Sequence, residues 1–208
     1  MYIGFRIILK YEIKTRKELI NIMEEKTVVV EFNQDNLDRF LDEYYKSHRK
    51  GKNLIVENPL PRSMNKILVI TNRIVQNNHK KYRGMYVEYV LKELGLEKLG
   101  ICETDLKLQF VFPTKVRHDL DNMLGGMKEI MDKFSDVGMI QDDNYSIIKS
   151  ISASASYEKD ISKLIMSFEN CKYDVQATLE QMEKERIKRE KRENTMSEKK
   201  KAKKKKVK

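Results

Sequence analysis

The sequence predicts a fold that mixes helices and strands in one main domain, with appendages at both ends. Some segments alternate apolar and polar residues, which is typical of half-buried strands, and others repeat apolar residues at helical spacing. The chain has 208 residues, of which 40% are hydrophobic and 36% are charged. That length suits one main domain, and the high charge favours long exposed helices or tails.

The first 50 residues predict a βαβα extension. Tyr2–Ile13 and Thr27–Phe32 are rich in β-branched and aromatic residues, so each is predicted to be a strand. Between them, Thr15 and Glu18 fit a capping box, in which both side chains satisfy free amides at a helix start. The second helix is predicted from apolar residues at helical spacing, namely Leu37, Phe40, Leu41 and Tyr44. The extension is either a module for a partner or additional packing for the main domain.

Residues 54–170 predict the main domain, which a polar break separates from the extension. Its clearest strand is Asp105–Phe112, in which every second residue is Leu or Phe and after which Pro113 stops the strand. The remaining predicted elements are the strand Leu54–Glu57, the helices Lys80–Leu94 and Asn122–Val137, and the strands Tyr145–Ser156 and Lys163–Phe168.

Residues 174–208 predict a tail that begins as a helix and ends in disorder. Asp174–Asn194 is a polar helical stretch, and Met196–Lys208 is a low-complexity, lysine-rich run without apolar partners. Residues 184–208 contain 14 basic and 4 acidic residues and therefore carry the whole net charge of +10. Such a tail attracts phosphates without reading sequence, or it only solubilises the chain.

Several protein classes are excluded by composition. Cys102 and Cys171 are too few for a disulfide framework or a cysteine-based zinc site, which favours a reducing cytoplasm. No apolar run approaches the roughly 20 residues of a membrane helix, and the first ten residues lack a signal-peptide pattern. We therefore expect a cytoplasmic protein that makes no membrane contact.

Two pairs of carboxylates flank Asn122–Val137, the second predicted helix of the main domain. Asp119 and Asp121 follow the apolar strand, and Asp142 and Asp143 precede the next strand. Clustered carboxylates repel each other unless a cation neutralises them, and hard oxygen donors suit Mg²⁺ or Mn²⁺. Lys128 on the intervening helix is a candidate to supply positive charge to a phosphate.

The same residues also have plainer interpretations. Asp119 is a candidate helix cap, and consecutive aspartates before a strand are often only a turn. The helix is long enough to hold the two pairs apart, so the spacing alone leaves open whether they converge.

Three motifs in order give the chain a resemblance to the RusA-like Holliday-junction resolvases. The run Phe112–Asn122 resembles the strand end, basic stretch and D-L-D-N core of that family. Gly138–Asp143 resembles its G-x-x-x-D-D element, and Pro61–Asn65 is similar to its P-x-S-x-N segment. The resemblance covers residues 54–170 and leaves the extension and the tail outside it.

The resemblance implies a small α+β fold with a RusA-like mixed sheet, acting as a homodimer that binds four-way junctions and cuts them with Mg²⁺. It implies that Asp119, Asp121 and Asp143 are metal ligands, supported by Asp142. Family members also use a lysine on the helix after D-L-D-N, and Lys128 falls at that place when counted back from the second aspartate pair. Counted forward, Lys128 arrives three residues late, which indicates a three-residue insertion around the Gly125–Gly126 pair. An ordinary surface lysine is the alternative.

Basic residues beside the first aspartate pair are candidates for DNA contact. Lys115, Arg117 and His118 are expected to touch the DNA backbone, although His118 is also interpretable as an ordinary surface histidine. Three functions fit: a junction-resolving endonuclease in DNA recombination or repair, a metal nuclease for other branched DNA, and a non-catalytic binder of branched DNA. The resemblance suggests a bacterial or phage-encoded protein.

Overall fold

The structure is a computed structural model that describes residues 26–51 and 54–205. The predicted strand Tyr2–Ile13 and the capping box of Thr15 and Glu18 lie outside the described residues. The fold is α+β, as expected, with a mixed sheet and helices packed against it. No helix within the two described ranges is long and apolar enough to cross a membrane.

A four-stranded sheet forms the centre of the fold, in the order β1-β4-β2-β3. β1 pairs antiparallel with β4, β4 pairs antiparallel with β2, and β2 pairs parallel with β3. A parallel pair requires the chain to cross back along the sheet, and the helices α5 and α6 make this crossover. The strands are β1 (Thr27–Phe32), β2 (Ile101–Phe112), β3 (Ile148–Tyr157) and β4 (Lys163–Tyr173).

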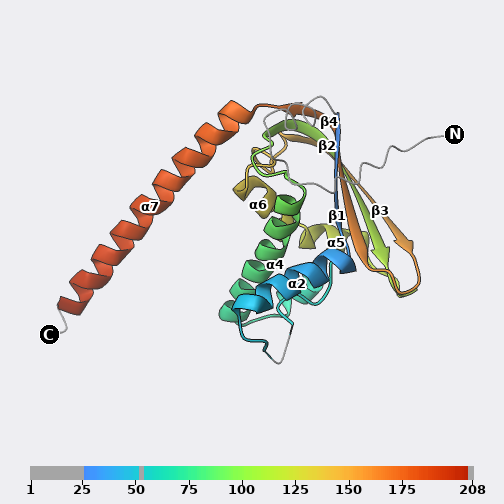
Figure 1. The fold of residues 1–208 in the computed structure, drawn as a ribbon, viewed down its shortest axis with the longest axis horizontal. Coiled ribbons are helices and arrows are strands. Elements are labelled where there is room, and N and C mark those ends of the chain that lie inside the picture. Colours follow the sequence, from blue (N-terminus) through green and yellow to red (C-terminus); the bar gives the residue numbers. More distant parts are fainter. Residues whose placement is uncertain (1–25, 52–53, 206–208) are drawn as a thin grey trace.

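Helices cover one face of the sheet. Figure 1 shows α2, α4 and α6 gathered on one side of the strands, while α7 extends away from the body. Buried residues alternate along β1 and β4, as expected for strands with one covered face. The helices are α2 (Gln34–Ser47), α3 (Met64–Leu68), α4 (Arg73–Glu93), α5 (Leu120–Gly126), α6 (Lys128–Asp136) and α7 (Val175–Lys205).

A cluster of buried aromatic rings joins the sheet to its helices. Phe32 of β1 lies 5.6 Å from Tyr86 of α4 and 6.4 Å from Phe134 of α6, measured between ring centroids. Phe134 in turn lies 5.6 Å from Phe168 of β4. Residues 27–47, which the sequence assigns to an extension, therefore share the core of the main domain.

The segment before α3 is irregular, so the predicted strand Leu54–Glu57 is wrong. Two prolines close behind it remove amides that a strand would donate. Its backbone is fixed instead by Arg83 of α4, whose guanidinium donates to the carbonyls of Pro59 at 3.2 Å and Leu60 at 3.0 Å. The short apolar run marks core packing, not strand pairing.

Several predicted bounds were too short. α4 begins at Arg73 instead of near Lys80, because the side chain of Asn72 caps it by accepting from the amide of Ile74 at 2.9 Å. β2 begins at Ile101 and β4 ends at Tyr173, so both strands are longer than the alternation indicates. α3 was not predicted at all.

The predicted helix Asn122–Val137 is two helices that meet at Met127. The amide of Met127 donates to the carbonyl of Leu124, three residues back, so the last turn of α5 is tightened. A Cβ at Gly126 would lie 1.9 Å from the carbonyl oxygen of Arg62, and one at Gly125 would lie 3.0 Å from Met64. Because neither glycine carries a Cβ, the 61–64 segment can pack directly against α5.

The expected disorder from Met196 is also corrected, because α7 continues to Lys205. Residues 175–205 contain no glycine or proline and are rich in Lys, Glu and Arg, which favour helix. Local propensity therefore extends the helix beyond the region where apolar residues support it.

Two glycine-to-alanine variants should have opposite effects on stability. Gly126→Ala places a methyl group into backbone, so we expect a loss of about 1–3 kcal/mol, the usual cost of overpacking. Gly84→Ala in α4 meets only the end of the Lys133 side chain at 3.9 Å, so it should gain about 0.5–1 kcal/mol. Urea unfolding of both variants measures this, and an unchanged Gly126→Ala midpoint would contradict the close approach.

Candidate active site

Asp119 and Asp121 lie where the chain leaves β2 and enters α5. Asp119 takes the N-cap position with φ −79° and ψ 120°, but its carboxylate makes no capping hydrogen bond. Its Oδ2 atom instead accepts from the side-chain amide of Asn122 at 3.4 Å. Asp121 is exposed in the first turn, where negative charge is favoured by the backbone amides. Both carboxylates thus face solvent beside the basic loop.

The three basic residues of that loop differ in how they are held. The His118 ring stacks on Phe112 with a centroid separation of 4.0 Å and an angle of 11°. The Lys115 amine lies 5.4 Å from the ring centroid of Tyr157, at the end of β3. Arg117 is exposed and has no polar partner within the described part of the chain, so its guanidinium faces solvent.

Asp142 and Asp143 lie in the loop of residues 138–147, which is fixed to the start of β2. The amide of Ile101 donates to the carbonyl of Met139 at 2.9 Å. The amide of Gln141 in turn donates to the carbonyl of Ile101, also at 2.9 Å. The Asp142 carboxylate accepts from the amide of Asp143 and from the side chain of Asn144, both at 2.8 Å. Asp142 therefore shapes the loop and makes no ion pair with any other described residue.

Lys128 connects the second aspartate pair to the crossover helix. Its Nζ atom lies 3.1 Å from Oδ1 of Asp132 and 3.8 Å from Oδ2 of Asp143. The hydrogen bond to Asp132, together with the charges of Asp132 and Asp143, raises the pKa of Lys128. The lysine is 71% exposed and fully charged at neutral pH, so it can meet an anion from solvent.

Asp132 is the residue of this group that sequence reasoning missed. Its Oδ2 atom accepts from Nζ of Lys80 in α4 at 2.6 Å, while Oδ1 accepts from Lys128. Burial acts to raise the pKa of Asp132, but the hydrogen bonds from Lys80 and Lys128 outweigh it and lower the pKa. The spacing of four between Lys128 and Asp132 was an available signal, whereas the contact with Lys80 depends on tertiary packing.

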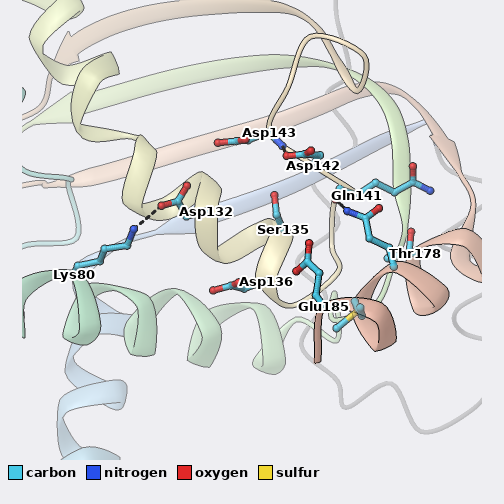
Figure 2. A pocket seen from close by; sticks show the side chains of 11 residues that line it. Lys80, Asp132, Ser135, Asp136, Gln141, Asp142, Asp143, Thr178 and Glu185 are labelled. Carbon is cyan, nitrogen blue, oxygen red and sulfur yellow. Dashed lines mark hydrogen bonds and ion pairs between the residues drawn. The ribbon is translucent and has the colours of Figure 1, made fainter. Parts of the chain in front are cut away.

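Lys80, Asp132, Asp142 and Asp143 border a pocket of about 300 Å³, which we call the acidic pocket. Figure 2 shows its aspartates and Glu185 around the opening, with Lys80 bonded to Asp132. Asp136 at the pocket pairs with Arg189 of α7, whose Nη2 atom lies 2.7 Å from Oδ1 of Asp136. The carboxylates at the pocket are Asp132, Asp136, Asp142, Asp143 and Glu185. Lysine and arginine side chains therefore neutralise much of their charge.

The predicted metal ligands have suitable chemistry but are not gathered. Carboxylate oxygens are the donors that Mg²⁺ and Mn²⁺ prefer. Within residues 26–51 and 54–205, however, no three acidic, histidine or cysteine side chains lie close enough to hold one ion. Asp142 and Asp143 border the acidic pocket, while Asp119 and Asp121 do not. The residues as placed do not form a metal site.

A larger pocket of about 590 Å³ brings the Pro61–Asn65 segment and the Phe112–Asn122 run together. The segment Pro61–Ser63 forms one part of its wall, and Phe112 and His118 form another. Burial lowers the pKa of Arg83 to about 10 and raises the pKa of Glu129. The P-x-S-x-N-like segment and the basic loop thus share one hollow, adjacent to α5.

Comparison with protein-family models and with curated proteins gave no match. The resemblance to RusA-like resolvases therefore rests on the sequence motifs alone.

The ion pairs of Asp132 predict a pH-dependent contribution to stability. Because its folded-state pKa lies below the ordinary 3.8, the contribution is present above pH 3.8 and is lost as the pH falls through the lower value. Asp132→Asn should cost about 1 kcal/mol or less near neutral pH, and the difference should vanish in acid. Urea midpoints measured from acid to neutral pH test this.

Asp42→Asn is the matched control, since Asp42 lies exposed on α2 and makes no polar contact with any other described residue. It should leave the midpoint unchanged throughout. A constant difference between wild type and Asp132→Asn at every pH would refute the ion-pair account.

Proposed function

We propose that this chain is a metal-dependent endodeoxyribonuclease that acts on branched DNA, with the four-way Holliday junction as its substrate. The observation that carries the proposal is the approach of Lys128 to Asp143, at 3.8 Å. It joins the helix after the D-L-D-N run to the D-D element, two motifs that lie far apart in the sequence. The shared pocket of Pro61–Ser63 and His118 adds the third motif.

Each residue has a separate role in the proposed reaction, the hydrolysis of one phosphodiester by water. The positive charge of Lys128 stabilises the negative charge that develops on the phosphate. Lys115, Arg117 and His118 bind the DNA backbone next to the reacting bond. The resemblance, and not the placement of the carboxylates, makes Asp119, Asp121 and Asp143, supported by Asp142, the proposed ligands for Mg²⁺ or Mn²⁺.

The carboxylates as placed do not gather around one point. Metal dependence is therefore expected from the resemblance alone. The same separation favours a second candidate function: a protein that binds branched DNA and does not hydrolyse it. In that case Lys128 and the basic loop would hold phosphate, and the acidic pocket would remain neutralised by its own lysines. The two functions differ in one measurable property, cleavage.

The first functional prediction is cleavage that depends on Asp121 and on a divalent ion. Asp121→Asn should lower the cleavage rate of a synthetic four-way junction by at least about 100-fold, comparable to the loss of a main electrostatic contributor. Binding should be retained or tighter, because one negative charge fewer faces the phosphates. EDTA should abolish cleavage by the wild-type protein, and Mn²⁺ or Mg²⁺ should restore it.

Asp42→Asn again supplies the control, with the same chemical change made on α2. It should cut at the wild-type rate. Undiminished cleavage in EDTA would reject the metal mechanism. Junction binding without any cleavage at any tested ion concentration would favour the non-catalytic alternative.

The second functional prediction is a homodimer. A four-way junction resolved by two symmetric nicks needs two active sites related by a two-fold axis, which a homodimer provides. Light scattering at micromolar concentration should therefore give twice the 24.7 kDa mass of one chain. A monomeric mass together with efficient paired nicking would contradict the expected assembly.

A further inference from the structure

The helix α7 presents three different faces between Val175 and Thr195. One face packs against the body, where Gln181, Met182 and Glu185 line the acidic pocket and Arg189 bonds to Asp136 at 2.7 Å. A second face holds ion pairs within the helix, in which Arg186 bonds to Glu183 and Glu190, each at 2.6 Å. The third, which we call the basic face, lines a shallow hollow and comprises Lys184, Ile187, Lys188, Lys191, Arg192 and Thr195.

The cations of the basic face have no carboxylate partner in the part of the chain that the structure describes. Acidic residues are available on the same helix, but Glu183 and Glu190 bond to Arg186, and Glu185 lies 3.8 Å from Arg189. The charges of Lys184, Lys188, Lys191 and Arg192 therefore reinforce one another on one side of α7. A like-charged stripe costs free energy in isolation, and a polyanion relieves that cost.

The position of α7 connects this stripe to the candidate active site. Glu185 borders the acidic pocket, and the basic face begins at its neighbour Lys184, less than a third of a turn around the same helix. Figure 1 shows the helix continuing outwards from there as a straight arm. A DNA strand that reaches the pocket can thus continue along α7.

We propose that the basic face of α7 is a docking surface for the backbone of duplex DNA that leads to the candidate active site. This inference rests on the proposed function and assigns the arm to it. From Lys184 to Arg192 the helix rises about 12 Å at about 1.5 Å per residue. Duplex DNA carries one charge per about 1.7 Å of its axis, so several phosphates lie within reach. Contacts of this kind position DNA without reading its sequence.

The test is a salt titration of binding to an unbranched duplex in EDTA, with the full chain. The variant K184Q/K188Q/K191Q/R192Q removes the four charges and keeps residues that favour helix. Its slope of log affinity against log salt should become shallower by up to about 3.6, because each lost phosphate contact removes about 0.9. The variant K46Q/K81Q/K92Q/K159Q removes the same charge from other exposed positions and should keep the wild-type slope.

The outcomes separate this inference from the proposed function. Three results would overturn the docking surface. The two variants could lose slope equally, the basic-face variant could keep the wild-type slope, or the wild-type chain could fail to bind duplex DNA. A basic-face variant that changes only the oligomeric mass would identify a protein contact and also overturn it. Junction cleavage with Mg²⁺ is measured separately, so a chain that never cuts but shows the expected slopes keeps the docking surface and loses the catalytic proposal.

Discussion

The parallel pairing of β2 with β3 determines where every candidate residue lies. Because both strands run in the same direction, the chain between them must return along the whole length of the pair. That return places Asp119 and Asp121 beyond the end of β2, and Asp142 and Asp143 before the start of β3. Lys128 lies between them on the crossover. The topology therefore separates the two aspartate pairs and leaves the helix as their connection.

Lysine and arginine side chains already neutralise carboxylates of the acidic pocket, as a bound cation would. Asp132 accepts from both Lys80 and Lys128, and Arg189 bonds to Asp136. An entering ion must therefore compete with, or displace, these ammonium and guanidinium groups. Lys128 is the most exposed of them at 71%, which makes it the group best placed to turn towards a substrate phosphate.

Much of the fold was predictable because local patterns and tertiary burial agree. β1 coincides with the predicted Thr27–Phe32, and α2 buries the predicted Leu37, Phe40 and Leu41. The errors arise where distant contacts decide. Arg83 fixes a proline-flanked segment that resembles a strand, and the carbonyl of Arg62 requires the glycine at which α5 ends. Within the site, the Lys128–Asp132 spacing was visible, but the contact of Lys80 with Asp132 was not.

The close approach of Gly126 to Arg62 also ties α5 to one wall of the larger pocket. With backbone oxygen so near the glycine, α5 and the 61–64 segment pack backbone against backbone. Any rearrangement that carried Asp119 and Asp121 towards Asp143 would therefore drag one wall of the larger pocket with it. The position of Asp119 and Asp121 and the shape of that hollow thus depend on the same backbone contact.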